Sequence, residues 1–399
     1  MQSVPRGRKF KVFVHLGHGF GATKWRERYA AGLIPGLNQE LPYGYHLAPN
    51  GGNWSITYSE DAKEAVATQL LRRGLLRLIG FDLIHAWRNR HHLFASDVVW
   101  THTEREHLAV LLLRWLSRGD HRPAIIAQCI WLFDKWPNLP LWKQQFYLCL
   151  LRQAELVTTL SPRNLEYARV LLPQTDCEAM MFGVGSAVSG RVAKTTSDGP
   201  IKLLALGNDY HRDWEILIEA FGGISDYQVR IGSNSAPRRL VNRLRNVSIQ
   251  PANNAQELRD LYEWSDLVVV PLKENLHASG ITVVLEAILL GVPVVCTDTG
   301  GIRAYFSDDH IRYVPVSDPN ALRAAADELA TSITLRRQLV LAAQKRVVSA
   351  GFTAQGFADR HRRLSESLLK IHTKSFASGH DSRSDGLSPT LTASECTSN

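Results

Sequence analysis

The stretch from 277 to 301 constrains the fold of this chain more than any other part of its sequence. Small and polar residues ending near Ser279 precede an apolar run with helical spacing, and a serine there predicts the N-cap of a helix that begins near Ile281. Gly291 predicts the end of that helix, and residues 292–296 form a short apolar run typical of a buried parallel strand. The stretch therefore predicts a loop, a helix, a strand and a second loop, as in an α/β domain.

The first loop of this stretch is a candidate anion site. Backbone N–H groups at a helix N-terminus attract anions, so the amides of Gly280, Ile281 and Thr282 are candidate ligand donors, beside Ser279. Glu286 lies inside the apolar helix. A carboxylate there is either solvated on the outer face, which is the more common arrangement, or accepts hydrogen bonds from hydroxyl groups of a bound ligand.

The same residues resemble the donor-binding signature of the family 4 glycosyltransferases, which have the GT-B fold. In that signature a glutamate, seven residues and a second glutamate precede a Gly-x-Pro-Val strand and a Gly-Gly loop. Glu286 matches the second glutamate, and the resemblance implies that it holds the ribose of a nucleotide sugar. The first glutamate, which touches the donor sugar in the family, falls on Ala278. The loop residues implied to shape the donor pocket are Thr299, Gly300 and Gly301.

Composition narrows the classes of partner. The 399 residues are 45% hydrophobic and 21% charged, which is typical of soluble globular proteins of two or three domains. No apolar run approaches the roughly 20 residues of a membrane span, and no signal peptide is recognised. Five scattered cysteines favour a reducing, cytoplasmic location. The net charge of +8 fits a nucleotide diphosphate, a lipid phosphate or a membrane face, whereas its even spread along the chain argues against nucleic acid.

A glycine-rich loop follows the first predicted strand, at residues 9–16, and Gly19 is its candidate ligand-binding residue. Such a loop lets a phosphate or a sugar approach the backbone closely, although a tight turn without a ligand fits equally well. The resemblance implies that this loop lies across the cleft from the nucleotide. A nicotinamide-dependent dehydrogenase is disfavoured, because no convincing acidic residue ends a second strand about 20 positions on.

His102 lies at the carboxyl end of a strand predicted at 97–102, where open α/β sheets bind their ligands. Many family members have a sugar-contacting histidine after the next strand, and this chain has none there, so His102 is a candidate catalytic residue; a structural histidine is the default alternative. A helix predicted within 59–79 contains Arg72, Arg73 and Arg77. A Rossmann-type helix with a basic outer face is favoured there over a membrane-surface helix. Further strands are predicted at 82–85, 124–128 and 156–160.

A second block of strands and helices begins with a strand predicted at 201–206 and a polar loop that leads into a helix. The family clamps the donor diphosphate with an arginine and a lysine in this loop, and these positions fall on Asn208 and Arg212. A guanidinium binds a diphosphate bidentately, and a cation at a helix N-terminus is unfavourable unless an anion is bound. Protonated His211 would replace the charge that is missing at Asn208.

These blocks predict two Rossmann-like doubly wound domains that face a cleft, which is the GT-B fold. The predicted divisions are an N-terminal acceptor domain at 1–185, a linker at 186–199 and a donor domain at 200–350. A helix at 351–372 is predicted to cross back to the first domain, and the polar tail at 373–399 is predicted to be disordered.

The resemblance implies a retaining glycosyltransferase that moves a hexose from a nucleotide-diphosphate sugar to a glycan or a lipid-linked acceptor. Its expected setting is cell-surface polysaccharide synthesis, peripheral to the inner face of the cell membrane. His102 and Glu286 are the candidate catalytic residues. No Asp-x-Asp occurs, so no metal and no cofactor besides the donor are expected. Two alternatives stay open: a catalytically impaired relative that binds a nucleotide sugar or a partner, and a nucleotide-sugar epimerase.

Overall fold

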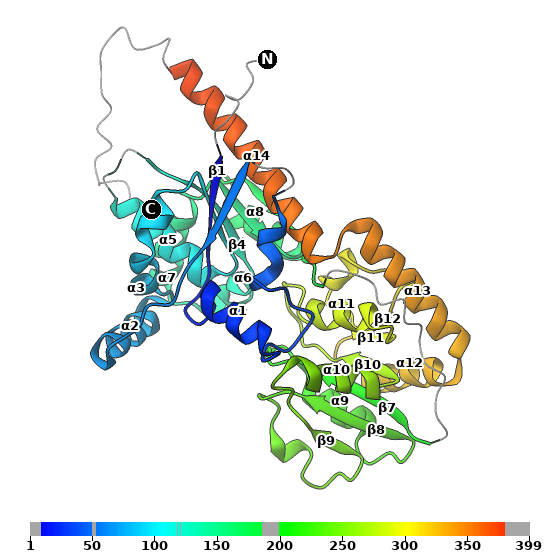
Figure 1. Cartoon of the computed structure of the whole chain (residues 1–399). Helices are drawn as coiled ribbons and strands as arrows, with labels where there is room; N and C mark the ends of the chain where they lie inside the picture. The colour runs from blue at the N-terminus through cyan, green and yellow to red at the C-terminus, as the bar shows by residue number, and fades with distance from the viewer. Residues whose placement is uncertain (1–8, 50–52, 118, 120, 186–198, 380–399) are drawn as a thin grey trace.

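A computed structural model of the chain describes residues 9–49, 53–117, 119, 121–185 and 199–379, with side chains as far as residue 369. The chain forms two parallel six-stranded sheets, each covered by helices on both faces (Figure 1). Their strand orders are β2-β1-β3-β4-β5-β6 and β12-β11-β10-β7-β8-β9. The predicted pair of doubly wound domains is therefore confirmed.

The first sheet consists of β1 (Phe10–His15), β2 (Trp54–Tyr58), β3 (Val98–Thr101), β4 (Ala124–Cys129), β5 (Leu156–Thr159) and β6 (Cys177–Ala179). Its helices are α1 (Ala22–Ala30), α2 (Val66–Ile79), α3 (Leu83–Arg88), α4 (Arg90–Phe94), α5 (Glu104–Leu116), α6 (Leu132–Lys135), α7 (Leu141–Leu151) and α8 (Pro162–Leu171), with short 3-10 helices η1 (Pro42–Leu47) and η2 (Trp136–Asn138). The central strands are buried on both faces, as parallel strands between helix layers must be.

The second sheet consists of β7 (Ile201–Leu206), β8 (Tyr227–Gly232), β9 (Val247–Ile249), β10 (Leu267–Val270), β11 (Val294–Thr297) and β12 (Arg312–Val314). Its helices are α9 (Trp214–Phe221), α10 (Ala255–Trp264), α11 (Ile281–Leu289), α12 (Pro319–Thr331) and α13 (Ile333–Ala350), with η3 (Arg238–Leu240) and η4 (Ile302–Ala304). The helix, strand and loop predicted within 277–301 are α11, β11 and the loop that follows β11.

Each sheet reverses its strand order once. In the first sheet β1 pairs with β2 on one side and with β3 on the other. In the second sheet β7 pairs with β8 on one side and with β10 on the other. At such a switch point the two connections leave in opposite directions and open a crevice beyond the carboxyl ends of the strands. The switch points at β1/β3 and β7/β10 are therefore the places to examine for ligands.

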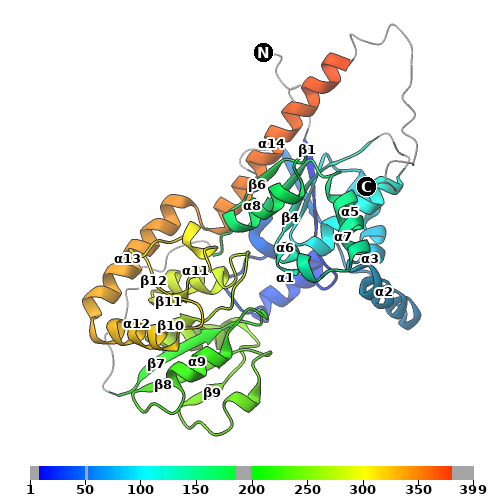
Figure 2. The same cartoon turned by 180° about the vertical axis from the view of Figure 1, so that it is seen from behind.

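Helix α14 (Ala354–Gly379) runs from the second domain along the first (Figures 1 and 2). The Trp100 indole N–H donates to the Ser365 hydroxyl over 2.8 Å, and Arg360 Nε donates to the Met181 carbonyl over 3.0 Å. The helix continues to Gly379, past the point where the disordered tail was predicted to begin. Residues 380–399 and most of the predicted linker, 186–198, lie outside the described residues.

One predicted strand, at 82–85, is wrong. Asp82 caps helix α3 at this position, because its Oδ1 accepts the His85 backbone N–H over 3.0 Å. Leu83 and Ile84 belong to this helix and are both half-buried, and Leu83 packs against the core of the first domain. Among the described helices, none combines the length and the apolar character that a bilayer crossing requires.

Candidate active site

Arg212 lies at the β7/β10 switch point, in the loop that follows β7. Its Nε donates to the Leu206 carbonyl over 2.8 Å, and its Nη1 donates to the Ser279 hydroxyl over 2.9 Å. The residue is only 5% exposed. Burial lowers the pKa of the guanidinium, against the opposing effect of Asp209. Arg212 is therefore a buried cation, and the alternative of a surface helix residue is wrong.

Two glycines with left-handed backbone conformations make room for this guanidinium. Gly207 has φ 135°, and a Cβ atom there would lie 2.4 Å from Arg212 Nε. Gly280 has φ 86°, and a Cβ atom there would lie 3.5 Å from both Nη atoms of Arg212 and 2.6 Å from a Val270 methyl carbon. The charge is therefore held beside the first turn of α11.

Helix α11 begins at Ile281 as predicted, but Ser279 does not cap it. Gly280 is the N-cap residue, and no side chain caps the helix. The Ser279 hydroxyl instead donates to Asp209 Oδ2 over 3.1 Å while it accepts from Arg212. The Ile281 N–H donates to the Ala278 carbonyl over 3.1 Å. Since a partner already engages that amide, Gly280 and Thr282 are the better placed of the predicted backbone donors.

Glu286 is buried, so its more common solvated arrangement is wrong for this chain. Only 5% of the residue is exposed. Its Oε1 accepts the Leu37 backbone N–H from the first domain over 2.9 Å, and its Oε2 accepts the Tyr262 hydroxyl over 3.0 Å. Burial raises the pKa of Glu286, and these two hydrogen bonds oppose the rise. The carboxylate is thus directed at the interface between the domains.

The loop after β11 packs against the opening of α11. A Cβ atom on Gly301 would lie 3.0 Å from the Ala278 Cα, and Gly300 at φ 83° faces the Arg163 side chain. The Thr299 hydroxyl is buried and has no hydrogen-bond partner among the described residues. Asn208 braces a neighbouring loop, because its Oδ1 accepts from Ser233 and Asn234. The predicted donor residues of the second domain therefore converge on one region.

A cluster of titratable side chains lies at the same place, and the sequence analysis named only His211 among its members. His277 lies between two carboxylates: its Nδ1 is 2.8 Å from Asp134 Oδ2, and its Nε2 is 3.0 Å from Asp209 Oδ2. Asp134 belongs to α6 of the first domain. His211 Nδ1 is 3.2 Å from Asp209 Oδ1. The pair Asp209 and His211, next to a predicted site residue, was a usable sequence signal, whereas nothing in the sequence connects Asp134 to them.

Charge stabilises this cluster. Burial alone raises the pKa of Asp209 and Asp134, but hydrogen bonds from the histidines outweigh it and hold both pKa values below their usual range. Burial alone lowers the pKa of His277, and here too the two carboxylates outweigh it, so the net pKa is raised. The cluster therefore forms an electrostatic link between the two domains.

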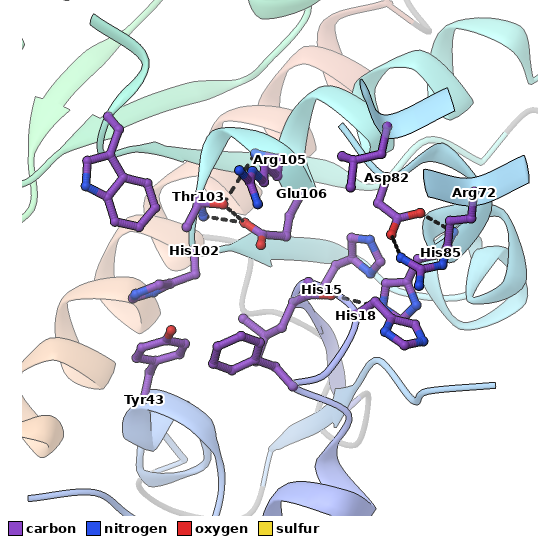
Figure 3. A pocket seen from close by; sticks show the side chains of 15 residues that line it. His15, His18, Tyr43, Arg72, Asp82, His85, His102, Thr103, Arg105 and Glu106 are labelled. Carbon is purple, nitrogen blue, oxygen red and sulfur yellow. Dashed lines mark hydrogen bonds and ion pairs between the residues drawn. The ribbon is translucent and has the colours of Figure 1, made fainter. Parts of the chain in front are cut away.

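The β1/β3 switch point holds a cavity of about 270 Å³ (Figure 3). It is lined by His15, Leu16, Gly17, His18, Phe20, Tyr43, Arg72, Leu76, Asp82, His85, His102, Thr103, Arg105, Glu106 and Trp131. Aromatic rings, imidazoles, two carboxyl groups and two guanidinium groups thus share one pocket. Such a mixture suits a polyhydroxylated ligand, because rings cover its carbon faces while polar groups bind its hydroxyls.

His102 lines this pocket, but its surroundings keep it neutral. Its ring stacks on that of Tyr43 with centroids 3.5 Å apart, and the Tyr45 hydroxyl lies 2.9 Å from its Nδ1. Burial, with a smaller effect of His361, lowers the pKa of His102 to about 3. Gln128 Nε2 is a donor and also approaches Nδ1, so Nδ1 accepts and the proton is on Nε2. His102 is thus equipped to donate one hydrogen bond.

Glu106 is a further pocket residue that the sequence analysis did not single out. Its Oε2 accepts from both the backbone N–H and the hydroxyl of Thr103, at 2.5 Å each, as the N3 residue of a capping box. Burial raises the pKa of Glu106 to about 7, although these hydrogen bonds oppose the rise. A carboxyl group that titrates near neutral pH can accept or release a proton during a reaction.

Gly19 lies in the loop above this pocket, with φ 103°. Its backbone N–H donates to Asp61 Oδ1 over 2.9 Å. A carboxylate therefore occupies the position at which a phosphate would meet this amide. Gly19 and His102 lie in the first domain, apart from the donor residues around Arg212.

Comparison with known proteins supports the fold and the second domain. Residues 200–332 match the family model of the glycosyl transferases group 1. Sucrose-phosphate synthase from Thermosynechococcus elongatus superposes with a TM-score of 0.65 at 15% identity, over 90% of this chain and 100% of that chain. The N-terminal domain of Candida albicans trehalose-6-phosphate phosphatase superposes with a TM-score of 0.62 at 11% identity, over 92% of this chain and 99% of that chain.

Anabaena Alr3699/HepE, solved in complex with UDP and glucose, has a TM-score of 0.58 at 12% identity, with 89% of this chain and 99% of that chain covered. No match was found among curated proteins. The predicted resemblance to group 1 glycosyl transferases and the predicted GT-B fold are confirmed.

Proposed function

Since the chain is a glycosyltransferase of the GT-B type whose second domain matches the group 1 family, we propose that it is a retaining hexosyltransferase. It takes a hexose from a nucleotide-diphosphate sugar and transfers it to a glycan or a lipid-linked acceptor in cell-surface polysaccharide synthesis. The donor binds at the β7/β10 switch point and the acceptor binds in the pocket at β1/β3.

The burial of Arg212 beside the first turn of α11 carries the donor assignment. A buried cation at the positive end of a helix is unfavourable by itself, and its hydrogen-bond acceptors here are the neutral oxygens of Leu206 and Ser279. A diphosphate would compensate both the guanidinium and the helix N-terminus. Gly207 and Gly280, both with positive φ, leave room beside the first turn of α11 for the Arg212 guanidinium.

Glu286 binds the ribose in this proposal. Its carboxylate now accepts from Leu37 and Tyr262, and each oxygen retains a second lone pair. A ribose hydroxyl would take the place of the Leu37 N–H or share its acceptor. In either case the ribose binds next to Leu37, which belongs to the first domain, and this couples donor binding to the interface between the domains.

In the transfer step the bond between the anomeric carbon and the diphosphate oxygen breaks, and the acceptor oxygen bonds to that carbon on the same face. The leaving diphosphate takes the electron pair of the broken bond. Arg212 and the amides of Gly280 and Thr282 stabilise its developing charge. The acceptor hydroxyl gives its proton to the leaving diphosphate oxygen, and closure of the domains excludes competing water.

The pocket at β1/β3 has the chemistry of an acceptor site. His102 offers an Nε2–H donor, Tyr43 offers a ring face, and Glu106 offers a carboxyl group with a pKa of about 7. Tyr43 also has an unusual backbone conformation, with φ 58° and ψ 6°. Such strain in a non-glycine residue is retained where the surrounding structure imposes it, which is frequent at ligand sites.

Helix α2 supports a lipid-linked acceptor at a membrane surface. The side chains of Leu70 and Leu71 are each 64% exposed, and Val66 and Leu78 are 72% and 61% exposed. Leu76 on the same helix lines the pocket. An exposed apolar face next to an acceptor pocket suits a helix that lies in the membrane interface.

Only two of the three arginines in the predicted basic face of α2 are exposed to solvent. Arg73 and Arg77 are exposed, whereas Arg72 is buried and pairs with Glu64 and Asp82 at 2.8 and 2.7 Å. The electrostatic part of the membrane contact therefore rests on Arg73 and Arg77.

A second candidate is a relative that binds a nucleotide sugar without transferring it. Ala278 favours it, because this buried residue replaces the carboxylate that touches the donor sugar in the family. Binding of a nucleoside diphosphate without turnover of any nucleotide sugar would favour this candidate over the enzyme.

A thermal-shift panel of UDP, GDP, ADP and NAD tests the donor site, with wild type, Glu286→Gln and the exposed-site control Glu166→Gln. A ligand at about 100 times its Kd stabilises the folded state by about 2.7 kcal/mol. We expect one nucleoside diphosphate to stabilise wild type and the control but not Glu286→Gln. The proposal fails if no nucleoside diphosphate stabilises wild type, or if NAD does so alone.

A further inference from the structure

The cluster at the domain interface has the composition of a transition-metal site. Asp134, His211 and His277 each direct one ligand atom to a common place, and these atoms all lie within 4.8 Å of one another. Two imidazole nitrogens and one carboxylate oxygen are the ligand set preferred by Zn²⁺ and its neighbours among the transition metals. Mg²⁺ prefers oxygen ligands and is disfavoured here.

Asp209 supplies the orientation that such a site needs. His211 Nδ1 is 3.2 Å from Asp209 Oδ1, and His277 Nε2 is 3.0 Å from Asp209 Oδ2. When both histidines are neutral and direct their N–H groups at Asp209, their lone pairs are on His211 Nε2 and His277 Nδ1. Both of these atoms face Asp134. A carboxylate that holds metal-binding imidazoles by their distal N–H groups is a regular feature of metal sites.

The spacing of the ligand atoms fits a tetrahedral ion. Metal–ligand bonds of about 2.0–2.1 Å place neighbouring ligand atoms roughly 3.3 Å apart. His277 Nδ1 is 2.8 Å from Asp134 Oδ2, and His211 Nε2 is 3.8 Å from Asp134 Oδ1. These two distances lie on either side of the tetrahedral value, and all three ligand atoms lie within 4.8 Å of one another. Binding of an ion therefore requires the side chains to rotate toward a common centre.

The charges also balance. Asp134 and Asp209 are two carboxylates in an enclosed region, with side chains that are 3% and 18% exposed. One divalent ion neutralises both when the two imidazoles are neutral. Without an ion, a protonated His277 has to donate to both carboxylates. The cluster is then only an ion pair between the two domains.

We propose that Asp134, His211 and His277 bind one divalent transition-metal ion, best Zn²⁺, with Asp209 as the carboxylate that orients both imidazoles. Because Asp134 comes from α6 in the first domain and both histidines come from the second, the ion ties the two domains together. The site lies beside Ser279 and Arg212, but the proposal does not depend on the donor assignment.

Metal binding to the full chain, prepared without a histidine tag and without nucleotide, tests this proposal. The protein is stripped with EDTA, desalted and titrated with Zn²⁺ by calorimetry and with Co²⁺ by visible absorption. We expect one equivalent of each metal, with the intense visible bands of tetrahedral Co²⁺. Zn²⁺ should also raise Tm, and EDTA should reverse the rise.

Variants locate the ion. His211→Ala and Asp134→Asn should weaken Zn²⁺ binding by at least about 100-fold, and Asp209→Asn by about 10- to 100-fold. His91→Ala, at an exposed histidine of α4, should bind as wild type does. If His211→Ala does not fold, as judged by circular dichroism, His211→Gln takes its place.

Two results would overturn the proposal: no stoichiometric binding by wild type, or binding that His211→Ala and Asp134→Asn leave unchanged. Either result would leave the cluster as an ion pair. Nucleoside diphosphate binding in the thermal-shift panel is a separate measurement, so the metal site and the donor site can fail independently.

Discussion

The two switch points occupy equivalent places in their sheets but contain different things. At β1/β3 the side chains surround a cavity of about 270 Å³. At β7/β10 Arg212, Ser279, Asp209 and His277 fill the region and hydrogen-bond one another. The first site has an open pocket for a ligand. In the second site, the charged side chains are paired with one another and with Ser279.

In the proposed function, this difference follows from the ligand that each site binds. A neutral acceptor needs a pocket with rings and a few hydrogen-bonding groups, which are stable without ligand. An anionic donor needs positive charge, and buried charge without a partner is costly. The chain provides neutral hydrogen-bond acceptors for Arg212 and two donors for Glu286. In the proposed function the diphosphate adds the missing negative charge at Arg212, and the ribose competes with Leu37 for Glu286. Four predictions test this contrast, in order of decreasing effect.

The largest effect is expected at the charge of the second switch point. Arg212→Met keeps the side-chain volume but removes the cation, so binding of the stabilising nucleoside diphosphate should weaken about 100- to 1,000-fold, measured by calorimetry. The free energy of unfolding should fall by no more than about 2 kcal/mol, since a methionine packs well there. Arg73→Met on exposed α2 is the matched control. Equal affinity in both variants would remove Arg212 from the donor site.

Glu106 offers a test of the first switch point through pH. Its pKa of about 7 in the folded chain lies above the value of about 4.3 in an unfolded chain. Between these values the unfolded chain loses a proton that the folded chain keeps, so the stability gained from the protonated group at low pH is lost as pH rises. The loss is on the order of 3 kcal/mol by pH 8.

Glu106→Gln should abolish this loss, because glutamine keeps the capping box with Thr103 and does not titrate. Urea unfolding between pH 4 and pH 8 measures the difference. Glu166→Gln, at an exposed position of α8, should follow wild type. Parallel profiles for Glu106→Gln and wild type would show that the carboxyl group does not titrate near neutral pH.

A pair of glycines compares the packing of the two sites directly. Gly280 and Gly19 both have positive φ, but a Cβ atom at Gly280 meets a Val270 methyl carbon at 2.6 Å, while one at Gly19 meets nothing within 4 Å. Gly19→Ala should therefore cost about 1 kcal/mol from the backbone alone. Gly280→Ala should cost a further 1–3 kcal/mol, roughly, from overpacking. Equal losses in urea unfolding would contradict the description of the second site as filled.

The smallest effect concerns the membrane face of the first domain. Arg73→Gln and Arg77→Gln should each weaken binding to vesicles that contain phosphatidylserine by about 1 kcal/mol, or roughly fivefold. Binding to neutral phosphatidylcholine vesicles should not change. Arg337→Gln, at an exposed position of α13 in the second domain, is the control. If Arg73→Gln and Arg77→Gln weaken vesicle binding no more than Arg337→Gln does, α2 is not the element that contacts the membrane.

Local sequence signals predicted most of the elements that form both sites. The strand, glycine loop and helix at the start of each domain, and α11 with β11, lie within a few residues of their expected positions. Two local signals were misleading. Residues 82–85 looked like a strand, but Asp82 caps a helix, and Ser279 looked like a cap, but it binds Arg212 and Asp209. The Ser279 hydroxyl had competing partners, whereas Asp82 is itself a favourable N-cap residue that the apolar residues after it masked.

The sequence by itself determined the two doubly wound domains and the positions of Arg212, Gly280 and Glu286, because apolar spacing and glycine punctuation are local properties of the chain. Only the tertiary structure decided what these residues contact. Glu286 meets Leu37, 249 positions away, and His277 meets Asp134, 143 positions away. The same packing surrounds Glu106 and thereby raises its pKa. Burial and charge pairing between distant segments depend on how the two domains meet, and no local pattern encodes that.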